Sequence, residues 1–373
     1  MVHYRHSYHA GNFADVFKHV LLVGLLAALN RKDKPWSYLE THAGAGDYDL
    51  GGEGASRTLE WRDGVGRLQD GAGAPELVTE YLRLLAAARS QGHADRYPGS
   101  PLFARALARP DDRLVFCEKV PEVAAELKHA LRGDPRAAIH LRDGYEAHAL
   151  LPPAEKRGLV LIDPPFERTD EFDAMAELIV KSVGRFAGGV YAAWYPVKNH
   201  HRVLRFARRV AQDCGKPVLN LEFDTGAEAD DEIRFASTDR PAAARPQRPD
   251  RSGRPGRPAP ARRHDQSSGI VRIAEKKIMH ACGLLVVNPP FGFEQAAAAA
   301  LQWLKPRLAQ GPRAGFTLTR AGEGADPPPA DVPPAGRGRR ETAGEGRRSE
   351  RPQPGSGTRP RPAGNGKKPF RKN

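Results

Sequence analysis

The sequence predicts an α/β sandwich with a mainly parallel sheet. Short apolar runs alternate along the chain with longer segments of helical periodicity, and this alternation is typical of strands joined by crossover helices. The runs also end in turn residues: Gly158–Ile162, for example, is followed by an aspartate and two prolines. Such a run predicts a buried strand that delivers a polar group to the edge of the sheet.

The N-terminal part begins with a His- and Tyr-rich segment that passes into a helix at about Phe13–Asn30. Its apolar run, Val20–Leu29, is too short to span a bilayer and predicts a buried helix, so we expect no membrane association. Pro35–Glu40 has the pattern of a strand. Because helical periodicity runs through 53–109, we expect 47–109 to form a helical subdomain inserted after this strand.

From Leu114 onward, strands and helices alternate. The apolar runs predict strands at Leu114–Cys117, Ile139–Leu141, Leu159–Ile162, Gly189–Trp194, Val218–Phe223, Gly283–Val287 and Gly315–Thr319. The longer amphipathic segments between them predict helices at about Val120–Leu131, 171–185, 199–213 and Gln295–Leu308.

The chain's basic charge is confined to two segments that can hardly build a core. Of the formal net charge of +13, Arg240–Arg263 contributes +7 and 321–373 contributes +6, so the rest is neutral. With 33 prolines, 38 glycines and a mean hydropathy of -0.57, we expect 225–275 to be a low-complexity insert and 321–373 a disordered tail. Residues 1–320 would form the folded domain. The basic segments either neutralise RNA phosphates without sequence preference or are merely solvated.

The chain offers no pattern typical of a metal site or a disulfide framework. Its three cysteines are far apart and form no CxxC motif: Cys117, Cys214 and Cys282. Three histidines are closely spaced but have no Cys or acidic partner in their pattern: His3, His6 and His9. We therefore predict no metal. A reduced, cytoplasmic setting is the simplest inference, and the N-terminus has no signal-peptide pattern.

The motif Asp163-Pro164-Pro165-Phe166 carries groups that can bind an exocyclic amine. The prolines remove two backbone N–H donors and leave neighbouring carbonyls free to accept hydrogen bonds. The acidic side chain adds an acceptor, and the aromatic ring can stack on a flat base whose NH2 faces acceptors only. An ordinary turn at the end of a strand can have the same sequence. The residues upstream must therefore decide between a turn and an amine-binding motif.

Three upstream strand ends carry further polar or small residues. A GxG loop, Gly44 and Gly46, allows close approach of a cofactor, although the third glycine of a dinucleotide motif is missing. Glu118 follows the next strand and could accept two ribose hydroxyls, and Asp143-Gly144 follows the third, where Asp could meet an adenine amine. Each also fits an ordinary loop or turn. Their order resembles S-adenosylmethionine-dependent methyltransferases that act on exocyclic amines through a (D/N/S)PP(Y/F/W) motif.

The resemblance narrows to one family through five ordered segments. These are Tyr4–Asn12 with Asp15, Lys18-His19, Thr41–Gly46, Tyr97–Pro101 and Leu161–Pro165. Together they closely resemble the bacterial RlmJ family, which methylates N6 of one adenine in 23S ribosomal RNA. The resemblance covers about 1–224 and resumes from about 276 to 320, so the basic insert and tail depart from the family pattern.

The resemblance implies a Rossmann-like class I methyltransferase sheet with S-adenosylmethionine as cofactor. The residues implied to line the cofactor and catalytic pocket are Lys18, His19, His42, Ser100, Glu118, Asp143, Gly144 and Asp163. Asp163 would be the catalytic residue, Tyr4 and His6 would lie at the target adenosine, and Phe166 is expected to stack on the base. We expect a cytoplasmic monomer that acts on naked 23S ribosomal RNA or an early assembly intermediate.

A second copy of the motif, Asn288-Pro-Pro-Phe291, also follows an apolar strand. Asn288 can accept a hydrogen bond but cannot accept a proton, and the family carries a similar non-catalytic turn there, so we favour Asp163. Two other functions remain open. The first is a DNA adenine or protein-glutamine methyltransferase, although we see no sequence-reading domain for DNA. The second is a catalytically silent RNA-binding factor that uses the basic segments.

Overall fold

The computed structural model describes residues 6–68, 71–90, 95–227 and 279–321. Tyr4, most of the predicted insert 225–275 and nearly all of the predicted tail 321–373 lie outside the described residues.

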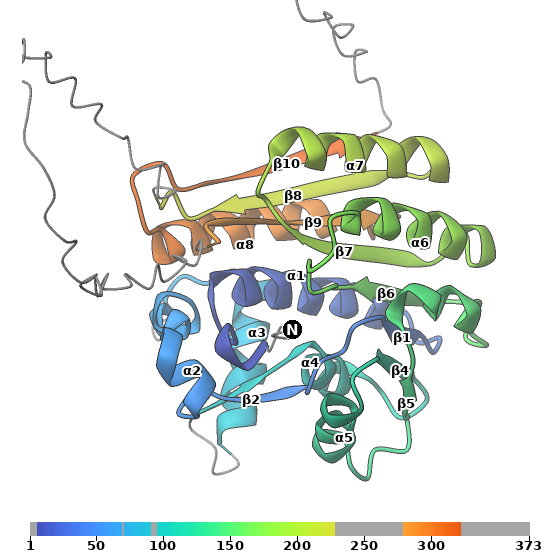
Figure 1. The fold of residues 1–373 in the computed structure, drawn as a ribbon, viewed down its shortest axis with the longest axis horizontal. Helices are drawn as coiled ribbons and strands as arrows, with labels where there is room; N and C mark the ends of the chain where they lie inside the picture. The colour runs from blue at the N-terminus through green and yellow to red at the C-terminus, as the bar shows by residue number, and fades with distance from the viewer. Residues whose placement is uncertain (1–5, 69–70, 91–94, 228–278, 322–373) are drawn as a thin grey trace, which may run out of the picture. The chain divides into compact units, whose positions relative to one another are not determined.

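Eight strands form one mixed sheet in the order β10-β8-β9-β7-β6-β1-β4-β5 (Figure 1). Their bounds are β1 Ser37–Glu40, β4 Arg113–Glu118, β5 Ala137–Leu141, β6 Gly158–Ile162, β7 Val190–Pro196, β8 Val218–Asp224, β9 Ala281–Val287 and β10 Gly315–Ala321. Neighbours from β5 to β7 pair in parallel, whereas β9 is antiparallel to β7 and β8, and β10 is antiparallel to β8. The predicted α/β class with a mainly parallel sheet is confirmed.

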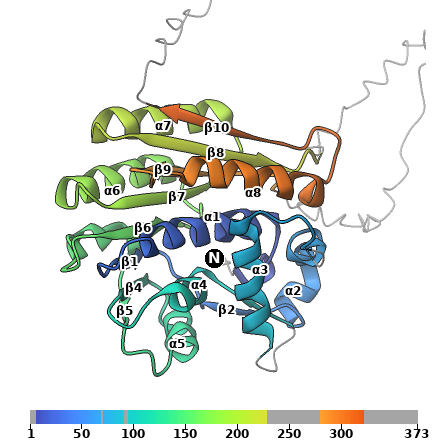
Figure 2. The same cartoon turned by 180° about the vertical axis from the view of Figure 1, so that it is seen from behind.

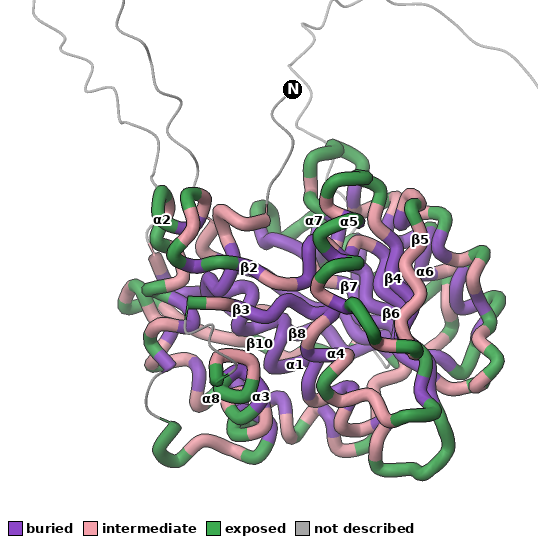
Figure 3. The backbone as a smooth tube through the Cα atoms, turned by 90° about the horizontal axis from the view of Figure 1, so that it is seen from below, coloured by how far each residue is buried: buried purple, intermediate pink, exposed green. Residues whose placement is uncertain are grey.

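Two hydrophobic clusters lie on opposite faces of this sheet, as successive strand residues show: Tyr38 belongs to one cluster and Leu39 to the other. The first cluster includes residues of α1 Phe13–Asn30, α3 Glu76–Arg89, α4 Ser100–Leu107, α5 Pro121–Ala130 and α8 Phe293–Leu308. The second includes residues of η4 Gly144–Leu150, α6 Glu171–Arg185 and α7 His200–Cys214. Figure 2 shows α8 and α1 on the side nearer the viewer, and Figure 3 shows the buried interior between exposed loops.

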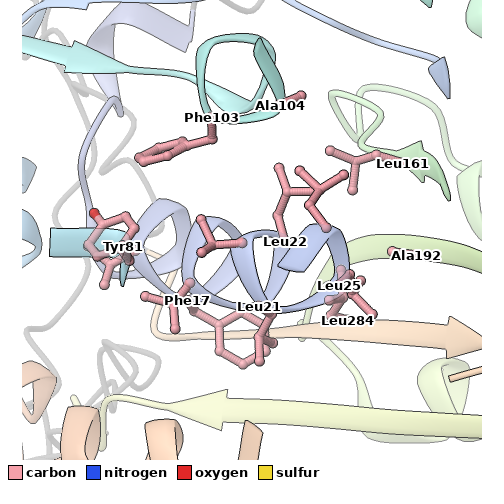
Figure 4. Close-up of a cluster of buried hydrophobic side chains, with 14 of the residues drawn as sticks. Phe17, Leu21, Leu22, Leu25, Tyr81, Phe103, Ala104, Leu161, Ala192 and Leu284 are labelled. Atoms are coloured by element: carbon pink, nitrogen blue, oxygen red, sulfur yellow. The ribbon is translucent and has the colours of Figure 1, made fainter. Parts of the chain in front are cut away.

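Helix α1 is the central helix of the first cluster. It begins after Asn12, whose side chain accepts hydrogen bonds from the N–H groups of Ala14 and Asp15. Figure 4 shows Phe17, Leu21 and their neighbours packed between the sheet and α4. By length and composition α1 could cross a membrane, but 78% of the relevant window is buried inside the protein. Burial of this kind is what a core helix requires.

The segment 47–109, expected to be helical, also contains two short strands. β2 Asp47–Asp49 pairs antiparallel with β3 Arg96–Pro98. Between them lie α2 Glu53–Thr58, η2 Glu60–Asp63, η3 Val65–Arg67 and α3, and another 3-10 helix, η1 His6–Tyr8, precedes α1. Three-residue strands are too short to produce a readable alternation of apolar and polar residues, so periodicity could not predict them.

Candidate active site

The catalytic candidate Asp163 lies where β6 ends, at the edge formed by the carboxyl ends of the parallel strands. Its Oδ2 accepts a hydrogen bond from Lys18 Nζ at 2.6 Å, although 145 residues separate the two in sequence. Phe166, which closes the motif, has a φ of 53°. A bulky residue in this left-handed region is strained, and such strain is frequent at active sites.

Lys18 is part of a buried chain of charges that reaches His6. Its Nζ also lies 3.0 Å from Asp15 Oδ1, and Asp15 Oδ2 contacts His6 Nε2 and accepts from Gly11 N, both at 2.9 Å. Burial alone would lower the pKa of Lys18, but the carboxylates of Asp15 and Asp163 hold that pKa well above its ordinary value. Asp15 belongs to the N-terminal motif, yet the sequence suggested no role for it.

This arrangement changes the role expected for Lys18. The resemblance implied that Lys18 and His19 line the cofactor pocket. In the structure both side chains are buried, and two carboxylates of the chain already hold Lys18. Lys18 is therefore placed to fix the position of Asp163.

His19 remains available for a carboxylate. Its Nδ1 lies 2.8 Å from the hydroxyl of Tyr97, and its buried Nε2 has no hydrogen-bond partner among the described residues. Burial lowers the pKa of His19 well below its ordinary value, so the ring is neutral. When Tyr97 donates to Nδ1, Nε2 carries the proton and is a donor in need of an acceptor.

Glu40, at the end of β1, was not recognised in the sequence as a site residue. Its side chain is fully buried and accepts hydrogen bonds from Tyr38 Oη at 2.9 Å and from Ser100 Oγ. Burial, only partly offset by these two donors, raises the pKa of Glu40 to about 8. Ser100, a predicted cofactor residue, therefore also helps to hold Glu40 at the pocket.

The pH dependence of stability tests whether Glu40 is neutral. Because the folded pKa of about 8 exceeds the ordinary 4.5, the native state keeps a proton that the unfolded chain loses. Its contribution is full below pH 4.5 and is lost as pH rises to about 8, at roughly 1.4 kcal/mol per unit. We expect Glu40→Gln to remove this slope in urea unfolding; an unchanged slope would show that Glu40 is ionised.

Glu118 lies at the end of β4 with both oxygens facing backbone donors. Oε2 accepts from Gly44 N at 3.0 Å and Oε1 from Val120 N at 2.8 Å. A carboxylate has about four acceptor positions, so lone pairs remain for two ribose hydroxyls. Gly44 has a φ of 64°, which only glycine adopts freely. The predicted glycine loop and acidic strand end therefore lie side by side.

Asp143 and Gly144 follow β5 and open η4. Asp143 accepts from Tyr145 N at 3.1 Å and from Lys119 Nζ at 2.8 Å. A Cβ on Gly144 would lie 2.1 Å from the carbonyl oxygen of Thr41 and 2.7 Å from His42 Cε1. Only glycine fits there, and it brings the β5 end against the His42 loop.

His42 packs edge-on against Tyr145, with ring centroids 5.1 Å apart. Its Nδ1 lies 2.7 Å from Thr41 Oγ1. Burial lowers the pKa of His42 to about 4, so the imidazole is neutral. A neutral ring of this kind offers one donor and one acceptor, not a positive charge.

Aromatic rings line the other side of Asp163. Phe166 lies edge-on to Phe172 and to Trp194, with centroid distances of 5.3 and 6.1 Å, and Lys18 Nζ lies 5.8 Å from the Trp194 ring. Sequence reasoning identified Phe166 but not Trp194. Its position in the neighbouring strand β7, one residue past Ala193, which pairs with Ile162 at the end of β6, was the available signal.

The second motif lies at the opposite edge of the sheet. Because β9 runs antiparallel to β7, Asn288 leaves the sheet away from Asp163. Asn288 Nδ2 donates to the carbonyls of Ala187 and Gly189, at 3.1 and 2.8 Å. The geometry favours a structural role for Asn288.

Within the described residues, no group of three or more His, Cys, Asp or Glu could hold a metal.

The described residues fit S-adenosylmethionine. The unpartnered Nε2 of His19 would meet a carboxylate, the Glu118 oxygens would meet ribose hydroxyls, and Asp143 would accept from an adenine amine.

Comparison with known proteins gives consistent matches. The family model described as Ribosomal RNA large subunit methyltransferase D, RlmJ, matches residues 33–239. The ribosomal RNA large subunit methyltransferase J of Escherichia coli is 34% identical over 83% of this chain and 94% of its own. The ribosomal RNA large subunit methyltransferase J of Haemophilus influenzae is 36% identical over 64% of this chain and 85% of its own. The crystal structure of protein LPL1258 from Legionella pneumophila has a TM-score of 0.66 at 29% identity, covering 84% of this chain and 99% of its own.

Proposed function

The chain belongs to the RlmJ family of ribosomal RNA large subunit methyltransferases, and from this membership we propose that it methylates N6 of one adenine in 23S ribosomal RNA. Membership makes the chain a methyltransferase that uses S-adenosylmethionine, built on a Rossmann-like class I sheet. The observation that supports an exocyclic amine as acceptor is the Asp163-Pro-Pro-Phe motif at the carboxyl end of β6, with Asp163 held by Lys18 at 2.6 Å.

The proposed mechanism starts from the weak nucleophilicity of the amine, whose lone pair is delocalised into the adenine ring. The Asp163 carboxylate and the Pro164 carbonyl accept hydrogen bonds from the two N–H groups of the amine. These bonds favour a pyramidal nitrogen with a localised lone pair. S-adenosylmethionine supplies an electrophilic methyl group on its sulfonium. Lys18 fixes the Asp163 carboxylate, which accepts the proton that the amine loses. Orientation and electrostatic complementarity then provide most of the acceleration.

The target adenosine must be unpaired or flipped to reach this motif. We propose that its base stacks on Phe166, whose ring already forms an aromatic wall with Trp194. His6, connected to Lys18 through Asp15, would contact the nucleoside together with Tyr4, which lies outside the described residues. We further propose that the enzyme is a cytoplasmic monomer acting on naked RNA or an early assembly intermediate.

Mass spectrometry of 23S ribosomal RNA fragments tests this proposal. We expect cells that lack the gene to lose one N6-methyladenosine, and the purified protein to restore it on their RNA. Genomic DNA and total protein from the same cells serve as parallel substrates with tritiated methyl donor. Methylation of DNA or protein but not of RNA would refute the proposed substrate, and no methylation of any of them would refute the proposed reaction.

A further inference from the structure

A small cleft of about 100 Å³ opens beside the catalytic motif. The residues that matter in its lining are Phe166, Arg168, Phe172, Lys198, Asn199 and Arg202. They come from the loops that follow β6 and β7 and from the first turns of α6 and α7, so the cleft lies at the same edge of the sheet as Asp163. Phe166 belongs both to this cleft and to the amine-binding motif.

The cleft carries positive charge that the protein does not neutralise. Arg168 pairs with Asp170 at 2.7 Å. Arg202 donates only to a neutral group, the Thr169 carbonyl, at 2.7 Å, and in the described part of the chain neither Lys198 nor Arg202 has an acidic partner within salt-bridge distance. Lys198 is exposed to solvent, so its ammonium can reach a ligand without losing an internal contact.

The acidic group in the lining, Glu171, is already engaged. Its buried carboxylate accepts from the Tyr145 hydroxyl and from Arg168 N, the latter at 3.0 Å. Both of its oxygens are therefore engaged, by η4 and by the loop before α6, and Lys198 and Arg202 bring two positive charges to the lining against this one carboxylate.

Resting on the proposed function, we propose that this cleft binds the RNA phosphodiester next to the target adenosine. At about 100 Å³ it is smaller than the roughly 300–1,000 Å³ of pockets that enclose whole small molecules, and it suits a phosphate-sized group. A phosphate held by Lys198 and Arg202 lies beside the ring on which the base stacks. The contact would fix the register of the strand, which basic low-complexity segments cannot do.

Paired charge-removal variants test this inference. In the test variant Lys198→Ala is combined with Arg202→Ala. The matched control combines Arg208→Ala with Lys216→Ala, which removes the same charges farther along α7 and just after it. For the test variant we expect the KM for RNA to rise on the order of tenfold, with kcat and the Kd for S-adenosylmethionine nearly unchanged. The slope of log affinity against log salt should fall by about 0.7, since each contacted phosphate contributes roughly 0.7 for a single strand and the cleft holds one phosphate.

A single variant, Lys198→Glu, guards against a folding defect, because Lys198 is exposed and its side chain donates no hydrogen bond within the described part of the chain. It should weaken RNA binding without changing the unfolding midpoint. Equal RNA affinity in Lys198→Glu, the double variant and the control would overturn the inference. Filter binding measures affinity apart from turnover, so a wild-type protein that binds RNA but transfers no methyl group would contradict the proposed function and leave this test valid.

Discussion

Replacing Asp163 by alanine should reduce methyl transfer to the assay background while leaving the fold intact. The change removes an acceptor for the amine hydrogens and the group proposed to take the proton. Loss of a single preorganised electrostatic contact in an active site typically costs about 10²–10³-fold in kcat, and Asp163 combines two roles. Lys18 keeps a second carboxylate, Asp15, at 3.0 Å, so its charge stays compensated in the variant. Tritiated methyl transfer to RNA measures activity, and thermal unfolding measures the fold.

Two companion variants sharpen the result. Asp163→Asn keeps an acceptor oxygen and should retain more activity than alanine, because its amide oxygen can still accept a hydrogen bond from the amine. Asn288→Ala should keep most of its activity, since its side chain only ties the β9 end to the carbonyls of Ala187 and Gly189. A folded Asn288→Ala protein without activity would move the active site to the other motif. Full activity of Asp163→Ala would refute the role of Asp163.

The sequence allowed most of the sheet to be predicted, because each long strand is an apolar run with turn residues after it. The predicted strand Leu159–Ile162, for example, corresponds to β6, Gly158–Ile162. The pairing of the strands with one another could not be predicted from these local patterns. That β9 is antiparallel to β7 depends on contacts between residues about 90 positions apart, and local patterns contain no such information. This direction is what separates Asn288 from Asp163.

For the site, sequence reasoning could place residues at strand ends but could not show what they touch. Glu118 and Asp143 were found because they follow apolar runs. Asp15 and Glu40 were missed as functional residues because an acidic residue in a helix or at a strand end is usually solvated. Their burial depends on α1 packing across the sheet, so only the tertiary structure shows that they hold Lys18 and Ser100.

Replacing Lys18 by methionine should harm stability more than replacing Asp163. Methionine preserves most of the apolar volume but removes the charge between Asp15 and Asp163, whose oxygens lie 3.0 and 2.6 Å from Nζ. Breaking a buried ion pair by removing one partner typically costs about 3–5 kcal/mol. The expected fall in the unfolding midpoint at neutral pH is on the order of 10 °C. Methyl transfer should also fall sharply, because Asp163 loses the group that positions it.

The surface pair Lys181–Glu177 provides the matched control, because both side chains are more than half exposed and only 2.6 Å apart. Lys181→Met should change stability by less than about 1 kcal/mol and leave activity unchanged. The pH dependence distinguishes a charge effect from a packing effect. In the wild type, burial raises the pKa of Asp15, but its contacts with His6 and Lys18 outweigh burial and hold that pKa well below its ordinary value. This carboxylate therefore stabilises the fold above pH 4, and the contribution is lost at lower pH. Without Lys18 the fold is relieved when the buried carboxyls of Asp15 and Asp163 take up protons. The loss in the free energy of unfolding caused by Lys18→Met should therefore shrink as pH falls from 7 to 4. A loss of unfolding free energy that does not change with pH would mean that Lys18 acts through packing alone.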